Sequence, residues 1–300
     1  MKLVRFSVDG GSPRLGLIQG DRIADAQASV AASLANRGVV RAQEIAAALV
    51  PQSARGFLEG GAATAEALSA VREWVTVPAS SARLHAPIND PGKFICIGLN
   101  YRDHAEETGN PIPKEPPLFA KWAPSIVGPG EPILRPRVSK QLDWEVELGV
   151  VIGRTARFVS REQALDYVWG YTIVNDASAR DFQFITTQWM AGKIFETAAP
   201  VGPYIVDRQE IADPHSLELR TFVNGKQMQR GNTKTFIFDV RYLVSYLSGL
   251  MTLSPGDLIA TGTPPGVGVG MKPPVFMNPG DVCRVEIDGL GSLENPIKDA

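Results

Sequence analysis

The N-terminal quarter of the chain combines two strand patterns with two helical patterns. Apolar segments at residues 2–8 and 15–23 indicate strands, the second interrupted by glycines. Ala-rich stretches near residues 41–49 and 62–74 have the composition of helices. None of the side chains in these segments suggests chemistry, so the pattern predicts a small α/β domain over residues 1–78.

Beyond residue 90, short apolar strands separated by turn signals dominate. Pro-Gly-Asp turns twice precede an apolar run, the second of which covers residues 282–287. One helix is expected to open at Ser160 and another at Asp239, the latter with an apolar stripe that indicates core packing. The Pro- and Ser-containing stretch at 79–89 predicts a linker. The chain is therefore expected to have an α+β fold, with a strand-rich domain over residues 90–300.

Three carboxylates occupy alternate positions of the apolar segment QLDWEVELGVVIG, at Asp143, Glu145 and Glu147. On a strand they would share one face at a spacing of about 6.6 Å, where each like-charged pair costs about 2.5 kcal/mol at an effective dielectric of about 20. A half-exposed antiparallel strand shows the same alternation, and we assign Asp143 to that alternative. For Glu145 and Glu147, with Asp176 at the end of the run YTIVND, a divalent cation would remove the repulsion. Because all these ligands are oxygens, the pattern predicts Mg²⁺ or Mn²⁺, with Ca²⁺ as the alternative, and argues against zinc.

A candidate base stands upstream, in FICIGLNYRDHAEETG. An apolar strand is followed by a short helix, whose start is indicated by Asn100 with Asp103 and whose end is indicated by the Gly-Asn-Pro at 109–111. His104 and Glu107 then lie at i and i+3 on one helix face. A carboxylate partner orients an imidazole and raises its basicity, so the pair predicts a general base for water. A purely structural histidine is the alternative.

The glycine-rich segment ATGTPPGVGVG does not predict a nucleotide site. It lacks the Gly-Lys-Ser/Thr ending of a phosphate loop, and MKPPVF follows it in place of a helix. Its backbone amides, with the hydroxyls of Thr261 and Thr263, would suit a substrate carboxylate. A tight Gly-Pro turn without a ligand is the alternative.

Composition limits the class of partner. With 44% hydrophobic residues the chain can build a sizeable core, and its net charge of −2 provides no basic surface for nucleic acid. No run approaches the roughly 18 apolar residues of a membrane span, and no secretory signal is visible, so we expect no membrane partner and a cytoplasmic location. Cys96 and Cys283 stand singly in apolar strands and are expected to be reduced core residues.

Five motifs, in their order and spacing, resemble the fumarylacetoacetate hydrolase family: GLNYRDHAEETG, DWEVELGVVIG, VNDASARDFQ, GKIFETAAPVGP and ATGTPPGVG. The resemblance covers roughly residues 90–297. It implies the family's mixed β-sandwich roll for the catalytic domain, a small-molecule 2-oxo acid as substrate, and a homodimer. The family form GKSFDTF is here GKIFETA, with Ile194 and Glu196 in place of Ser and Asp.

The resemblance also implies roles for individual residues. The metal ligands would be Glu145, Glu147 and Asp176. A dyad that activates water from a lid segment, with a lysine that faces the metal-bound substrate, would comprise His104, Glu107 and Lys193. The remaining matches fall where the family lines its pocket: Arg180, Asp181 and Gln183.

Such a site predicts a metal-dependent hydrolase acting on carbon–carbon bonds. It would cleave 2,4-dioxo acids (acylpyruvates, fumarylpyruvate or diketo sugar acids) to pyruvate and a carboxylic acid through a metal-bound enolate. The same apparatus could decarboxylate oxaloacetate, or isomerise or dehydrate a 2-oxo acid. A metal-dependent 2-oxo acid binding protein is the non-enzyme alternative, but it gives no reason to keep His104, Glu107 and Lys193 together.

Overall fold

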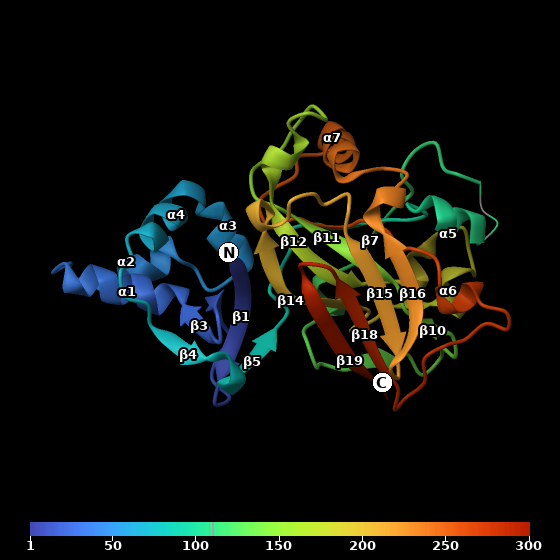
Figure 1. The fold of residues 1–300 in the computed structure, drawn as a ribbon, viewed down its shortest axis with the longest axis horizontal. Helices are drawn as coiled ribbons and strands as arrows, with labels where there is room; N and C mark the ends of the chain where they lie inside the picture. The colour runs from blue at the N-terminus through green and yellow to red at the C-terminus, as the bar shows by residue number, and fades with distance from the viewer. Residues whose placement is uncertain (108, 110) are drawn as a thin grey trace.

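The computed structural model describes residues 1–107, 109 and 111–300, and most of its strands belong to two sheets (Figure 1). The larger sheet has twelve strands. From one edge to the other its path is β4 (Thr76–Pro78), β3 (Arg22–Asp25), β2 (Arg14–Gln19), β1 (Lys2–Val8), β14 (Ala199–Asp207), β12 (Val168–Asn175), β11 (Val146–Ile152), β17 (Leu258–Ala260), β6 (Phe94–Ile97) and β7 (Leu118–Ala120). Off this path, β5 (Ala82–His85) pairs with β1 and β8 (Ile126–Val127) pairs with β14.

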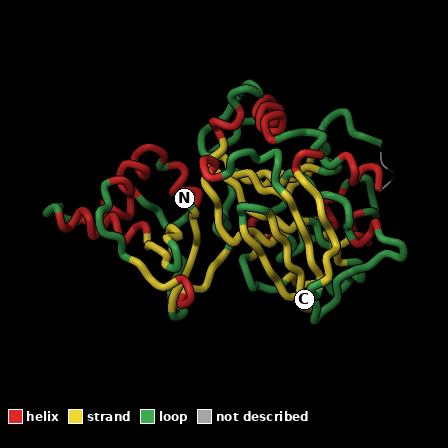
Figure 2. Tube along the Cα trace, in the orientation of Figure 1, coloured by secondary structure: helices red, strands yellow, loops and turns green. Residues whose placement is uncertain are grey.

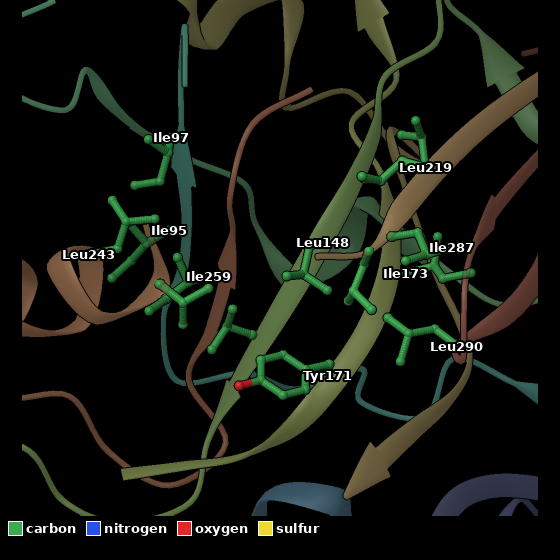
Figure 3. Close-up of a cluster of buried hydrophobic side chains, with 14 of the residues drawn as sticks. Ile95, Ile97, Leu148, Tyr171, Ile173, Leu219, Leu243, Ile259, Ile287 and Leu290 are labelled. Atoms are coloured by element: carbon green, nitrogen blue, oxygen red, sulfur yellow. The ribbon is translucent and has the colours of Figure 1, made fainter. Parts of the chain in front are cut away.

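The smaller sheet has five strands and packs on the large one. Its order is β16 (Lys226–Asn232), β15 (Glu218–Val223), β18 (Val282–Ile287), β19 (Gly291–Asp299) and β9 (Ile133–Arg135), and a separate ribbon joins β10 (Leu142–Asp143) to β13 (Ser178–Ala179). The strand β11 contacts β15, and β12 contacts β18. In Figure 3, Leu148 and Ile173 of the large sheet belong to the same buried cluster as Leu219 and Ile287 of the small one. The predicted α+β fold with a mixed β-sandwich is confirmed.

Helices lie at both ends of this sandwich (Figures 1 and 2). The α-helices are α1 (Ala26–Asn36), α2 (Ala42–Leu49), α3 (Ala54–Glu59), α4 (Gly61–Ser69), α5 (Arg102–Glu107), α6 (Arg180–Gln183) and α7 (Val240–Leu250). Short 3-10 turns are η1 (Ala79–Ser81), η2 (Ala123–Ser125), η3 (Ala164–Tyr167), η4 (Trp189–Gly192), η5 (Arg208–Glu210), η6 (Thr233–Thr235) and η7 (Gly268–Gly270). Within the described ranges, no helix has the length and apolar character needed to cross a bilayer.

The helix predictions had mixed outcomes. The helix expected at Asp239 is confirmed as α7, and the Asp239 carboxylate accepts the Tyr242 amide at 2.7 Å as its N-cap. The helix expected to open at Ser160 is wrong, because only the 3-10 turn η3 forms there. The helix α1 was missed; Asp25 caps it by accepting the Ala28 amide, but its Ala/Ser composition gives only a weak apolar stripe.

The predicted linker contains ordered secondary structure. Residues 79–89 include η1 and β5, and β5 pairs with β1 through contacts such as Phe6 with Leu84. In turn β1 pairs with β14, with Leu3 opposite Ile205. The large sheet therefore runs without interruption from the N-terminal strands into the strand-rich part, while the domain boundaries at 78 and 90 stay a prediction.

The residues with candidate chemical roles lie along the edge of the large sheet at which several of its central strands end. Because β11 pairs antiparallel with both β12 and β17, and β17 pairs parallel with β6, the start of β11 lies beside the ends of the other three strands. The segments that leave this edge carry the acidic residues, the glycine-rich loop and α5. The sandwich thus brings four distant parts of the sequence to one place.

Candidate active site and metal centre

Three acidic residues converge at this edge. Glu145, Glu147 and Asp176 each offer one oxygen, these oxygens lie within 4.8 Å of one another, and all three residues are buried. The register explains the convergence: Val146 pairs with Asn175, so Glu145 and Asp176 are neighbours, and the Asp176 amide donates to the Glu145 carbonyl at 2.9 Å. An oxygen-only, buried donor set at this spacing fits a hard divalent cation.

Three cationic side chains surround the acidic triad. The Lys193 ammonium donates to Glu145 Oε2 and to Asp176 Oδ2, both at 2.8 Å. The Arg180 guanidinium forms an ion pair with Glu145 Oε1 at 2.6 Å, and Lys121 forms one with Asp176 Oδ1 at 2.8 Å. The repulsion predicted from the sequence is therefore offset in part by the protein's own cations.

These charges separate the pKa values of two neighbouring carboxyls. Burial opposes ionisation of Glu145, but Lys193 and Arg180 outweigh it and lower the pKa of that carboxyl to about 2. Burial, together with the charges of Asp176 and Glu145, raises the pKa of Glu147 well above its ordinary value. The Gly262 amide, which donates to Glu147 Oε2 at 2.9 Å, only partly offsets that rise. Without a cation, Glu147 therefore holds a proton more readily than Glu145 does.

Asp143 is not the half-exposed strand residue that the alternation suggested. Its side chain is fully buried and accepts from the amides of Trp144, Gly268 and Val269 at 2.8, 2.7 and 3.0 Å. Its second oxygen accepts from Arg180 Nε at 2.8 Å. Asp143 therefore holds the arginine that pairs with Glu145, one step removed from the acidic triad.

Lys121 was missed by the sequence reasoning. It is 2% exposed, and its ammonium also donates to the carbonyls of Lys193 and Ala198 at 2.6 and 2.8 Å. The sequence did contain a signal for it, since Lys121 directly follows the apolar segment LFA. A lysine that is buried next to such a strand needs an anionic or polar partner, which would have pointed to the acidic residues. Its position fixes the backbone from which Lys193 reaches the triad.

The predicted dyad forms on α5. His104 Nδ1 lies 3.2 Å from Glu107 Oε2, and the Gly266 amide donates to both oxygens of Glu107 at 3.0 and 3.1 Å. A carboxylate fixed in this way directs the second ring nitrogen of His104 away from Glu107. The expected end of this helix includes Thr108 and Asn110, which lie outside the described residues.

Asn100 anchors the start of this segment by other contacts than the predicted helix cap. The helix begins at Arg102, and the Asn100 amide group donates to the carbonyls of Phe238 and Thr261 at 3.0 and 2.7 Å. Its oxygen accepts the Phe238 amide at 2.7 Å. The cap prediction is wrong because these long-range partners occupy the side chain, which ties the dyad segment to the residues just before α7 and just after β17.

The glycine-rich loop binds the protein's own carboxylates. Its amides at Gly262, Gly266 and Gly268 donate to Glu147, Glu107 and Asp143. The two threonine hydroxyls are also engaged, since Thr261 donates to the Leu148 carbonyl and Thr263 to the Val146 carbonyl. Of these two, Thr263 lines the cavity beside the triad.

The pocket residues implied by the resemblance divide into two groups. Arg180 and Gln183 are buried, line the cavity and bond to each other at 2.8 Å. Asp181 instead accepts from Ser139 Oγ at 2.7 Å and from the Lys140 amide at 2.9 Å. The structure therefore brings Arg180 and Gln183 to the site and turns Asp181 toward another loop.

A cavity of about 750 Å³ joins these groups. We call the part lined by Glu145, Arg180, Gln183, Lys193 and Thr263 its polar end; His104 and Glu107 also line the cavity. A cavity of this size accepts a small metabolite or a drug-sized ligand.

Comparison with known proteins identifies the family. Residues 93–298 match the family model described as fumarylacetoacetate (FAA) hydrolase, C-terminal. The chain belongs to the fumarylacetoacetate hydrolase family. The resemblance inferred from the five motifs is therefore confirmed, and the family contains enzymes.

Three relatives illustrate the family's range. The chain is 44% identical to the mitochondrial oxaloacetate tautomerase fahd2 of Xenopus laevis, over 99% of this chain and 90% of that protein. Among solved structures, it resembles the fumarylacetoacetate hydrolase of Exiguobacterium antarcticum with a TM-score of 0.79, 36% identity and full coverage of both chains. It also resembles the maleylpyruvate hydrolase of Sphingobium sp. SYK-6 in complex with manganese(II) and pyruvate, with a TM-score of 0.77, 30% identity and full coverage of both chains.

Proposed function

We propose that this protein is a metal-dependent hydrolase that cleaves the C3–C4 bond of 2,4-dioxo acids, giving pyruvate and a carboxylic acid. The observation that carries the proposal is that the His104–Glu107 pair and Glu145 of the acidic triad line one cavity. A cation held by the triad would polarise the 2-oxo group and stabilise negative charge on its oxygen. The oxygen-only triad and the manganese named for the maleylpyruvate hydrolase support Mg²⁺ or Mn²⁺.

The protein side chains account for the proton transfers. With Glu107 holding Nδ1, His104 accepts a proton from water through its other ring nitrogen, and the hydroxide adds to the C4 carbonyl carbon. When the C3–C4 bond breaks, its electron pair passes into the pyruvate enolate and the carboxylic acid departs. The enolate takes one proton at C3, so that one water is consumed per cleavage. Lys193, on the same cavity wall, offsets negative charge that develops near Glu145.

Keto–enol tautomerisation of oxaloacetate is the second candidate. It is favoured by the 44% identity to the frog tautomerase across almost the whole chain. This reaction moves a proton between C3 and the enol oxygen and needs no attacking water. The His104–Glu107 pair could serve it as a base without any other change in the site.

The experiment measures all the candidate reactions on one preparation. A chelator first removes bound metal from the protein, which is then assayed with and without added Mg²⁺ or Mn²⁺. Pyruvate release is measured from acetylpyruvate, from fumarylpyruvate and from oxaloacetate. Tautomerisation is measured as the loss of ultraviolet absorbance of enol-oxaloacetate. We expect metal-dependent pyruvate release from the acylpyruvates. If only the loss of enol-oxaloacetate is accelerated, the protein is a tautomerase and the hydrolase proposal is wrong. If pyruvate is released only from oxaloacetate, the protein is a decarboxylase. Full activity of the chelated protein would refute the metal dependence.

A further inference from the structure

The cavity has an aromatic wall directly beside its polar end. Phe119, at the middle of β7, and Trp189, at the start of η4, face each other edge to face with ring centroids 6.0 Å apart. The Lys193 ammonium lies over the Phe119 ring, 5.1 Å from its centroid. A substrate whose polar head lies near Lys193 therefore extends next along Phe119 and Trp189.

The backbone provides a seat for the tryptophan ring. A Cβ at Gly98, just after β6, would overlap the six-membered ring of Trp189, so only glycine allows the ring to lie against this strand end. Gly98 is itself fixed, because its amide donates to the Pro117 carbonyl at 2.9 Å. The glycine thus makes room for the tryptophan ring at this strand end.

Other residues that line the cavity are apolar as well. They are Val267, Val269 and Met271 of the glycine-rich loop and its continuation, and the exposed Phe184; together with Phe119 and Trp189 we call them the outer cavity. Apart from the polar end and the His104–Glu107 pair, the charged side chains among the described lining residues are Glu106 and Lys272, both exposed, where water screens a charge strongly. Aromatic faces carry partial negative charge and disfavour a carboxylate. The outer cavity therefore suits an uncharged, apolar group.

We propose that the preferred substrates are acylpyruvates with an apolar acyl group, alkyl or aryl, and that Phe119 and Trp189 determine this preference. The inference rests on the proposed function, because it takes the 2-oxo acid head to lie at the polar end. Such substrates differ from the dicarboxylic compounds maleylpyruvate and oxaloacetate, which carry a second carboxylate where these carry an apolar group. Each methylene group buried against the wall contributes about threefold to fourfold in affinity.

Binding of oxamates tests the inference without requiring turnover. Oxamate, N-propyl oxamate, N-benzyl oxamate and N-carboxymethyl oxamate share one chelating head and differ in the tail, and their dissociation constants are measured by calorimetry with Mn²⁺ present. We expect N-benzyl oxamate to bind at least about tenfold tighter than oxamate, and N-carboxymethyl oxamate to bind more weakly than N-propyl oxamate. In Trp189→Ala and Gly98→Ala, the ratio between N-benzyl oxamate and oxamate should fall to about threefold or less.

A matched control and a parallel activity assay make the outcomes distinct. Trp122→Ala removes an exposed tryptophan, 53% exposed, that is not among the described lining residues, and should keep the wild-type ratio. If oxamate binds and acetylpyruvate is cleaved, but the benzyl tail adds no affinity or the carboxymethyl tail binds best, the inference is overturned and the proposed function stands. If no oxamate binds with Mn²⁺ and no acylpyruvate is cleaved, the proposed function fails, and the inference with it.

Discussion

Replacement of Asp143 by Asn should destabilise the protein far more than an ordinary surface substitution. The Asp143 carboxylate is fully buried and accepts three backbone amides as well as Arg180 Nε. Asn keeps the shape but loses the charge, and its NH₂ group would face donors in place of an acceptor. Removing one partner of a buried ion pair costs about 3–5 kcal/mol, which for a chain of 300 residues corresponds to a fall in Tm of roughly 5–8 °C.

Urea unfolding and thermal melts of the chelated protein measure this loss. Asp181→Asn is the matched control, because Asp181 is only partly buried and bonds to Ser139 and Lys140; it should lose about 1 kcal/mol or less. In the double variant with Arg180→Met, the loss should be smaller than the sum of the two single losses, because the arginine is no longer left without its partner. A loss below about 1 kcal/mol for Asp143→Asn, or strict additivity in the double variant, would refute the reasoning.

Three further outcomes are expected. His104→Asn should lower acylpyruvate turnover by about 10²–10⁴ while Mn²⁺ and oxalate affinity, measured by calorimetry, stay within a few-fold; turnover at the wild-type rate would remove His104 from the mechanism. Burial and the neighbouring charges of Asp176 and Glu145 raise the pKa of Glu147, so cation binding to the metal-free protein should release a proton and become tighter as pH rises. Calorimetric titration in buffers of different ionisation enthalpy measures the released proton. A cation affinity that does not change with pH would contradict this prediction. Burial and two nearby arginines lower the pKa of His85 in the folded protein. As pH falls, His85 is therefore protonated in the unfolded chain before it is protonated in the folded protein. The contribution of His85 to stability is full above about pH 6.5 and is lost as pH falls through the lower folded value, and a His85→Gln variant should show a flatter urea midpoint between pH 7.5 and 5.

The parts of the site that the sequence predicted follow from local periodicity. Glu145, just before β11, and Glu147, on it, are two positions apart, the spacing at which strand side chains share a face, and His104 and Glu107 share a face because α5 is helical. Asp176 lies beside them because it directly follows β12, the strand paired with β11. The element types were predicted from the sequence, whereas Asp176 was grouped with the glutamates because it closes an apolar run and because of the family resemblance; the strand pairing itself was not predicted.

The parts that were missed depend on contacts between distant segments. Asp143 looked half-exposed because its partners, Arg180 and the amides of the glycine-rich loop, come from elsewhere in the sequence. Lys121 reaches Asp176 across the fold, and Asn100 reaches Phe238 instead of its own helix. No local spacing encodes these pairs. The homodimer and the cytoplasmic location likewise stay predictions.

The glycine-rich loop has a consequence for changing the substrate of this protein by mutation. Its amides hold Glu147, Glu107 and Asp143 at once, so a substitution that shifts the loop would disturb the acidic triad, the His104–Glu107 pair and the Asp143–Arg180 pair together. A library of variants drawn from this loop should consist mostly of inactive proteins. Trp189 packs on the Phe119 ring and against Gly98 instead of holding these carboxylates, so we expect a library built at Trp189 to alter selectivity while the acidic triad and the His104–Glu107 pair keep their geometry.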